Sequence, residues 1–295
     1  GGVTVPAYTT NSADDHAYVI SDAGAVAVVT SGGRIAAPAI AAARQTGARF
    51  TVAFEADAGA DHVLADLVDA HASEAAPPET LAAIGRDDLS SLIYTSGTGG
   101  APKGVMLSHR AIFANCKSAL DLVFDLDEIT DAEDEAFLSF LPLSHAYERT
   151  CGQFFPMSCR CQIYYAESIE RLAGNLVETR PTIMTAVPRL YESLHARISA
   201  GLKRESDFKQ RLFNRAVELG RRRIERGGLG FLEILEDATL DHLVRAKVKQ
   251  RFGGRLKALI SGGAPLNYEI GVYFAALGLR LLQGYGQTEA APVVA

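Results

Sequence analysis

Short apolar runs alternate with amphipathic stretches along the first third of the chain. Strands are predicted at Val3–Pro6, Val26–Val29 and Arg49–Phe54, where β-branched and aromatic residues gather. Helices are predicted at Ser12–Ser21, whose opening serine is an N-cap candidate, and at Ile35–Thr46. Strands that alternate with helices of this length indicate a largely parallel sheet covered by helices on both faces.

The second half of the chain repeats this alternation around a long polar segment. Between Leu202 and about Phe252 the pattern changes to long amphipathic helices rich in Lys, Arg and Glu, with a predicted break at Gly227-Gly228. We therefore predict an α/β fold of two lobes, residues 1–130 and 131–295, each with a mainly parallel sheet, and a helical insertion at about 202–252. The elements predicted in the second lobe are strands at Phe137–Leu141, Ile163–Tyr165, Ile183–Ala186, Leu256–Ile260 and Arg280–Leu282 and a helix at Ser168–Thr179.

Composition and charge narrow the class of protein. The 295 residues are 48% hydrophobic and 22% charged, as in ordinary globular proteins that bury a core without metal or disulfide staples. The 35 acidic and 29 basic residues leave a net charge of −6, which argues against a nucleic-acid partner. No apolar run reaches the ~18 residues of a membrane span. Because four cysteines are too few to staple this chain, we expect them to be reduced, in a cytoplasmic protein.

A strand that ends in a loop of glycines and hydroxyls is the most informative stretch of the sequence. The glycines let backbone N–H groups turn toward an anion, the hydroxyls add donors, and a lysine adds a charge for phosphate oxygens. Gly104–Leu107 is predicted as a second strand, with a helix starting only near Ser108. Because a proline precedes the lysine and no helix follows it directly, the loop differs from the Walker loop of P-loop NTPases. The predicted phosphate-binding residues are Thr95, Ser96, Gly97, Thr98, Gly99, Gly100 and Lys103.

The segment Tyr94–Gly104 resembles the phosphate-loop signature of the acyl-adenylate-forming (AMP-binding) superfamily. That superfamily includes acyl-CoA synthetases, adenylation domains of peptide synthetases and luciferases. Gly99 occupies a place where the family more often has Thr or Ser. The loss of one hydroxyl predicts weaker handling of the triphosphate. The resemblance implies the large N-terminal domain of adenylate-forming enzymes as the fold and ATP as the nucleotide.

Two downstream motifs are similar to those of the same family and follow in its order. Leu141–His145 resembles the motif at the mouth of the acyl pocket, where the family's histidine, here His145, lies beside the substrate carboxylate. Ser261–Leu266 follows a predicted strand and resembles the segment on which the family places adenine. Its glycines would let a flat ligand lie against bare backbone. The residues implied there are Gly262, Gly263, Ala264 and Pro265.

A third motif, Gln283–Glu289, also resembles the family. Tyr285 offers an aromatic face to a purine, and Thr288 can donate a hydrogen bond to the α-phosphate. Glu289 supplies a hard oxygen ligand for Mg²⁺, with Thr95 as a second ligand. The nucleotide-binding residues implied by this motif are Gln283, Gly284, Tyr285, Gly286, Gln287 and Thr288, and the catalytic residues implied overall are His145, Thr288 and Glu289.

The resemblance implies ATP- and Mg²⁺-dependent activation of a carboxylate to an acyl-adenylate, with release of pyrophosphate and transfer to a thiol. Leu143–Thr150, Ala186–Glu192 and the basic helical insertion are similar to long-chain fatty acyl-CoA synthetases, so fatty acid and CoA are the implied substrates. The family completes its site with a C-terminal lid domain that carries a lysine. We expect that domain to lie beyond Ala295, so that the 295-residue chain binds nucleotide but adenylates poorly or not at all.

Several alternatives stay open. The chain could activate another carboxylic acid, such as an amino or aryl acid for a carrier-protein thiol, or be a nucleotide-binding remnant without activity. The run Arg221–Arg223 is either a solvated helix face or a patch for anionic lipid headgroups or CoA phosphates, which would place the protein peripherally at a membrane. A homodimer is also left open.

Overall fold

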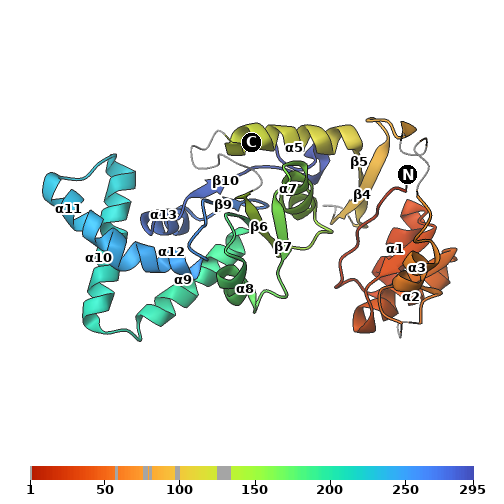
Figure 1. The fold of residues 1–295 in the computed structure, drawn as a ribbon, viewed down its shortest axis with the longest axis horizontal. Helices are drawn as coiled ribbons and strands as arrows, with labels where there is room; N and C mark the ends of the chain where they lie inside the picture. The colour runs from red at the N-terminus through yellow and green to blue at the C-terminus, as the bar shows by residue number, and fades with distance from the viewer. Residues whose placement is uncertain (1, 57–58, 76–78, 80–81, 97–99, 125–133) are drawn as a thin grey trace. The chain divides into compact units, whose positions relative to one another are not determined.

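The computed structural model describes residues 2–56, 59–75, 79, 82–96, 100–124 and 134–295 (Figure 1). The chain forms two compact units, Gly1–Ile112 and Phe113–Ala295, which are described in turn. The lobe boundary predicted at residues 130–131 lies in the segment 125–133, outside the described residues.

The first unit contains a three-stranded parallel sheet in the order β1-β2-β3. Two of its helices pack together through small apolar side chains, among them Ala17, Ile20 and Ala42. The strands and helices of this part are α1 (Ala13–Ala23), β1 (Ala27–Thr30), α2 (Gly33–Thr46), β2 (Phe50–Ala53), β3 (His62–Val63) and α3 (Leu64–Ala70).

Local sequence explains where α1 begins and ends. The Ser12 hydroxyl accepts a hydrogen bond from the Asp15 backbone at 3.2 Å, and the Asp15 carboxylate accepts one from the Ser12 backbone at 2.9 Å. This reciprocal capping box confirms the predicted N-cap. The helix ends at Gly24, which adopts the left-handed conformation. The strand predicted at Val3–Pro6 is wrong, because only a single bridge between Thr4 and Ser91 forms there.

An antiparallel hairpin completes the described part of the first unit. Strand β4 (Leu89–Thr95) pairs with β5 (Lys103–Ser108), and the last pair joins Thr95 to Lys103. The predicted second strand and the helix that follows it, α5 (His109–Phe124), are both confirmed. The hairpin therefore holds the two ends of the predicted phosphate loop opposite each other.

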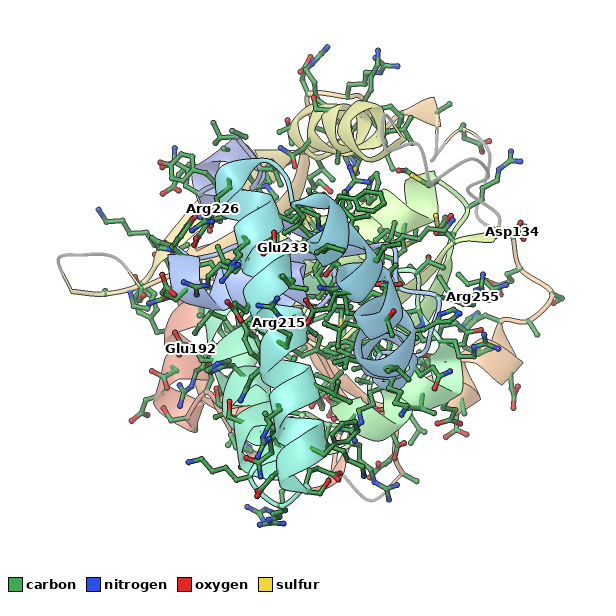
Figure 2. The ribbon with its side chains drawn as sticks, turned by 90° about the vertical axis from the view of Figure 1, so that its left-hand side faces the viewer. Asp134, Glu192, Arg215, Arg226, Glu233 and Arg255 are labelled. Atoms are coloured by element: carbon green, nitrogen blue, oxygen red, sulfur yellow. The ribbon has the colours of Figure 1, made fainter. Side chains whose placement is uncertain are left out.

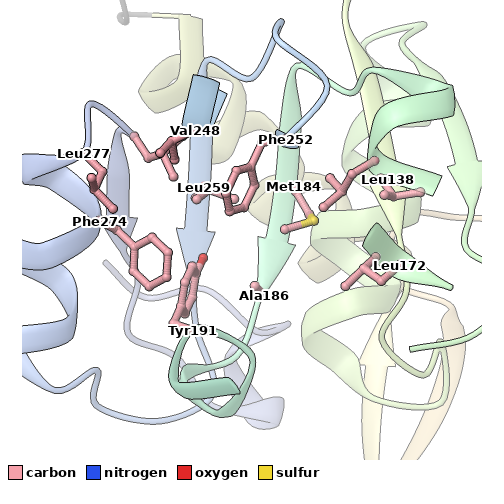
Figure 3. Close-up of a cluster of buried hydrophobic side chains, with 12 residues drawn as sticks. Leu138, Leu172, Met184, Ala186, Tyr191, Val248, Phe252, Leu259, Phe274 and Leu277 are labelled. Carbon is pink, nitrogen blue, oxygen red and sulfur yellow. The ribbon is translucent and has the colours of Figure 1, made fainter. Parts of the chain in front are cut away.

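The second unit is built on a five-stranded parallel sheet in the order β10-β9-β8-β6-β7. The five predicted strands are confirmed to within a few residues. Helices cover this sheet, and their contact forms the main core around Leu138, Met184, Leu259 and Phe274 (Figure 3). The elements are β6 (Ala136–Ser139), β7 (Gln162–Tyr165), α8 (Leu172–Thr179), β8 (Ile183–Ala186), α12 (Ala246–Arg251), β9 (Ala258–Ser261), α13 (Tyr268–Ala276) and β10 (Leu281–Gln283).

The predicted helical insertion is present. It consists of α9 (Pro188–Leu202), α10 (Asp207–Arg226), α11 (Phe231–Leu240) and a π-helical turn, η3 (Asp241–Arg245), before α12. Gly227 ends α10 with φ 72°, at the predicted break. Arg245 is fully buried and donates hydrogen bonds to the Ala276 and Ala216 carbonyls at 2.7 and 2.8 Å and to the Asp237 carboxylate at 2.5 Å. One side chain thus joins α10, α11 and α13.

Within the described part of the chain, every helix is either too short or too polar to cross a lipid bilayer.

Candidate functional site

Three of the predicted site segments follow strands of the same parallel sheet. His145 lies beyond the end of β6, Gly262 directly follows β9, and Gly284 directly follows β10. Because all five strands are parallel, these segments lie at one edge of the sheet, where their carboxyl ends meet. This edge is where open α/β sheets bind their ligands. The topology thus brings together the histidine, the predicted adenine segment and the predicted tyrosine–glutamate segment.

His145 is held in a defined orientation by the backbone that follows it. It is the N-cap of the short helix α6 (Ala146–Glu148), and its Nδ1 accepts a hydrogen bond from the Tyr147 backbone N–H at 3.2 Å. An accepting Nδ1 carries no proton, so the proton of the neutral ring lies on Nε2. Surrounding protein atoms partly desolvate the ring and lower the pKa of His145 below its ordinary value, although the residue remains open to solvent. The neutral imidazole is therefore favoured at pH 7.

Tyr147 connects the histidine segment with the end of β9. Its hydroxyl donates to the Ile260 carbonyl at 3.0 Å, and its buried ring lies against Gly262. A Cβ at Gly262 would come within 2.7 Å of that ring, so only glycine fits there. The next glycine, Gly263, has φ 82° and needs the left-handed conformation. Sequence reasoning missed Tyr147. The only signal was its place two residues after His145.

The segment after β10 turns back on itself and presents Tyr285. Gly284 donates to the Ser261 carbonyl at 2.8 Å, and Gln287 donates to the Pro292 carbonyl at 2.9 Å. A Cβ at Gly286 would come within 2.0 Å of the Pro292 carbonyl oxygen, so the close crossing requires glycine. The Tyr285 side chain is 66% exposed. An aromatic face is therefore available to a planar ligand.

A helix-borne asparagine fixes the far side of this turn. The Asn115 side-chain amide, on α5, donates to the carbonyls of Val293 and Ala290 at 2.7 and 3.2 Å. The turn includes the short 3₁₀ segment Thr288–Ala290, which carries the predicted catalytic pair. The Glu289 carboxylate is exposed and forms no ion pair or hydrogen bond with the residues that the structure describes. Its oxygens are therefore free to bind a cation.

The hairpin of the first unit presents the described part of the predicted phosphate loop. Thr95 and Lys103 end the two strands, Ser96 and Gly100 extend the loop, and Gly100 has φ 129°. Lys103 is exposed, and no acidic partner lies within reach among the described residues. The Tyr18 hydroxyl donates to the Pro102 carbonyl at 2.8 Å and fastens the base of the loop to α1. The other predicted residues, Gly97, Thr98 and Gly99, lie outside the described residues.

A buried carboxyl group lies under the histidine segment. The Glu148 side chain is 0% exposed and accepts hydrogen bonds from the Ser139 hydroxyl at 2.5 Å and the Thr185 hydroxyl at 2.8 Å. Burial raises the pKa of Glu148 more than these two hydrogen bonds and the backbone groups of Phe140 and Leu141 together lower it. Because Ser139 ends β6 and Thr185 belongs to β8, Glu148 joins two strands at the edge that carries His145. Sequence reasoning did not identify this residue.

The basic run of the insertion is engaged with acidic side chains. Arg221 pairs with Glu269, Arg222 with Glu233 at 2.7 Å, and Arg223 with Asp237 at 2.8 Å. On the same helix, Arg215 pairs with Glu236 at 2.7 Å (Figure 2 labels Arg215). These guanidinium groups therefore stabilise the contact of α10 with its neighbours.

The family model and the similar curated proteins point to the same family. The model of the family described as "AMP-binding enzyme" matches residues 1–295. Long chain acyl-CoA synthetase 6, peroxisomal, of Arabidopsis thaliana is 33% identical over 70% of this chain and 28% of its own length. The long-chain-fatty-acid–CoA ligase FadD15 of Mycobacterium bovis is 31% identical over 100% of this chain and 49% of its own length. The chain thus spans less than half the length of these curated relatives.

A solved structure supports the fold. The adenylation domain of a carboxylate reductase from Mycobacterium chelonae superposes with a TM-score of 0.70 at 22% sequence identity. The superposition covers 99% of this chain and 44% of that one. The predicted α/β architecture of an adenylate-forming N-terminal domain is therefore confirmed.

Proposed function

Because the chain belongs to the AMP-binding enzyme family, we propose that it is the nucleotide-binding part of a long-chain fatty acid–CoA ligase. The observation that carries the proposal is the meeting of three family-like segments, at His145, Gly262 and Gly284, at one edge of a parallel sheet. The long-chain acyl-CoA synthetases and ligases among the relatives support the choice of fatty acid and CoA as substrates.

The reaction proceeds in two steps. The fatty acid carboxylate attacks the α-phosphorus of ATP, a P–O bond forms, and the bond to the leaving pyrophosphate breaks. The product is an acyl-adenylate, whose carbonyl the CoA thiol attacks, with AMP leaving. Because two negatively charged groups must approach each other, the protein must neutralise charge and hold the nucleophile in line. No covalent bond to the protein is needed.

Each part of the site has a role in this scheme. Lys103, Thr95, Ser96 and the loop glycines bind the β- and γ-phosphates that leave together. The bare backbone from Gly262 to Pro265 and the exposed ring of Tyr285 bind adenine. Thr288 donates to the α-phosphate. The neutral His145, with its proton on Nε2, donates to the fatty acid carboxylate and orients it for attack.

The residues present also fit a magnesium ion. Glu289 is an exposed carboxylate without a protein partner among the described residues, and Thr95 is the second ligand that the sequence resemblance implies. Oxygen ligands of this kind suit Mg²⁺, which is held by few protein groups together with substrate phosphates. When bound, the ion neutralises phosphate charge as a Lewis acid.

Peripheral membrane contact is part of the proposal, because long-chain fatty acids partition into lipid. It is supported by exposed apolar side chains on the insertion, among them Phe231, Leu232 and Leu235 on α11, rather than by the arginine run, which is paired with acidic groups.

Nucleotide binding by the 295-residue chain tests the site. We expect isothermal titration calorimetry to show that Lys103→Ala raises the dissociation constant for ATP by at least about tenfold, since a hydrogen bond to a charged group contributes about 1.5–3 kcal/mol. Binding of AMP, which lacks the β- and γ-phosphates, should stay unchanged in this variant. Tyr285→Ala should weaken both nucleotides, and the exposed Lys203→Ala should weaken neither. Equal loss of ATP and AMP binding in Lys103→Ala would contradict the assigned role of the loop.

Substrate class is tested on the natural protein that contains this chain. Carboxylate-dependent exchange of pyrophosphate into ATP should be supported by palmitate and not by amino acids or benzoate. Glu289→Gln should require a higher Mg²⁺ concentration for half-maximal exchange. Exchange that responds to an amino or aryl acid but not to palmitate would assign the chain to the carrier-protein alternative.

A further inference from the structure

Two cysteines lie at the point where a short helix ends and β7 begins. The chain passes from α7 (Phe155–Ser158) through Cys159, Arg160 and Cys161 into the strand. Arg160 donates its backbone N–H to the Met157 carbonyl at 3.2 Å, and Cys161 donates to the Pro156 carbonyl at 2.9 Å. This pair of bonds is the Schellman arrangement that closes a helix.

The turn brings the two thiols together. Arg160 adopts the left-handed conformation with φ 62°, which a residue other than glycine rarely takes. Residues separated by one position have Cα atoms at most about 7 Å apart, and a tight turn between them shortens that distance into the range of disulfides. The two side chains are neighbours, and each shifts the pKa of the other. A disulfide therefore requires little movement of the backbone.

The surroundings distinguish these thiols from the other two. The neighbouring Cys161 thiol, together with the Ser158 hydroxyl at 3.8 Å, lowers the pKa of Cys159 to about 7. The same interaction raises the pKa of Cys161, and burial raises it further. Burial also raises the pKa of Cys116, which has Cys159 as a neighbouring group, to about 11, and that of Cys151. Only thiolates react readily, so Cys116 and Cys151 are inert by comparison.

We propose that Cys159 and Cys161 form a peroxide-oxidisable dithiol that is independent of the nucleotide site. The Cys159 thiolate attacks one oxygen of hydrogen peroxide, the O–O bond breaks, and a sulfenic acid and hydroxide result. The Cys161 thiol then attacks the Cys159 sulfur, the S–S bond forms, the S–O bond breaks, and water leaves. Starting from the thiolate and the thiol, the protein loses two electrons and one proton, and the peroxide becomes one hydroxide ion and one water.

Cys159 is buried and Cys161 is half-buried, so a small oxidant reaches the pair from the side of Cys161. The next residue, Gln162, already donates its backbone N–H to the Glu135 carbonyl at 3.0 Å and opens the pairing of β7 with β6. The loop closed by the disulfide between Cys159 and Cys161 thus ends where the sheet begins. The fold should therefore survive oxidation.

Peroxide titration of the 295-residue chain, followed by peptide mass spectrometry, tests the proposal. The wild type should lose two of its four free thiols and gain one disulfide in the peptide with Cys159 and Cys161, and dithiothreitol should reverse the change. Cys161→Ala should stop at a Cys159 sulfenic acid that dimedone traps. Cys116→Ala and Cys151→Ala serve as controls and should still form the disulfide.

The pH dependence of alkylation by iodoacetamide provides a second readout that does not need oxidant. The reaction of Cys159 should have its midpoint near pH 7 in the wild type and a higher midpoint in Cys161→Ala, which lacks the neighbouring thiol. A circular dichroism melt checks that each variant is folded. A disulfide that includes Cys116 or Cys151, or a sulfenic acid on Cys161 instead of Cys159, would overturn the proposal.

Discussion

Replacement of Glu148 tests whether the buried carboxyl group holds the histidine edge of the sheet. In Glu148→Ala the Ser139 and Thr185 hydroxyls, both buried, lose their acceptor. Each unsatisfied buried polar group costs about 1–3 kcal/mol, so the expected loss of unfolding free energy is about 2–6 kcal/mol. Glu148→Gln keeps the shape and one acceptor oxygen and should cost about 1–3 kcal/mol.

The pKa of Glu148 adds a dependence on pH with a defined sign. Because the folded-state pKa lies above the ordinary value of 4.5, the folded chain holds this proton more tightly than the unfolded chain. The resulting stabilisation is complete below the unfolded-state pKa and is lost as the pH rises through the folded-state pKa. The glutamine side chain in Glu148→Gln does not titrate. The stability difference between wild type and this variant should therefore be largest in acid and shrink as the pH rises.

Urea unfolding, followed by circular dichroism at several pH values, measures both effects. The exposed Glu178→Gln on α8 is the matched control and should change neither the midpoint nor its pH dependence. The account of this carboxyl group would be refuted by either of two results. One is a urea midpoint of Glu148→Ala equal to that of wild type. The other is a difference in unfolding free energy between Glu148→Gln and wild type that widens with rising pH.

Two further substitutions test a close backbone contact at Gly286 and the hydrogen bonds of Arg245. Gly286→Ala places a methyl group against the Pro292 carbonyl, which must move, so we expect at least tenfold weaker binding of AMP by calorimetry. Gly228→Ala, in open space, is its control, and equal affinities would contradict the reasoning. Arg245→Met removes the hydrogen bonds that join α10, α11 and α13, and should lower the unfolding free energy by about 3–5 kcal/mol. The exposed Lys247→Met should leave urea unfolding unchanged, and a comparable loss there would contradict a specific role for Arg245.

Features that depend on neighbouring residues could be predicted from the sequence. The Ser12 cap, the break after α10 at Gly227 and all five strands of the second sheet follow from local chemistry: a hydroxyl or glycine at a helix end, or a run of β-branched and aromatic residues. The strand order of the structure then places His145 and the two glycine-rich segments at one edge, because the carboxyl ends of parallel strands meet there.

Features that depend on distant residues could not be predicted. Tyr147 reaches the Ile260 carbonyl, Glu148 reaches Thr185, and Asn115 reaches Val293, and nothing in the local sequence of either partner specifies the other. The strand predicted at Val3–Pro6 does not form, although its local sequence favours one. Its residues favour an extended conformation, but only Thr4 finds a bridging partner, in Ser91, and a strand exists only where its backbone groups are paired.

The burial of Arg245 has a consequence for anyone who recombines this protein with its relatives. Its guanidinium group is the common anchor of three helices that are separated in the sequence. A chimera that exchanges α10 and α11 but keeps the recipient's α13 would combine the guanidinium group and its hydrogen-bond acceptors from different proteins. Crossover points should therefore fall before α9 and after α13, so that the guanidinium group and all the oxygen atoms that accept its hydrogen bonds come from the same parent protein.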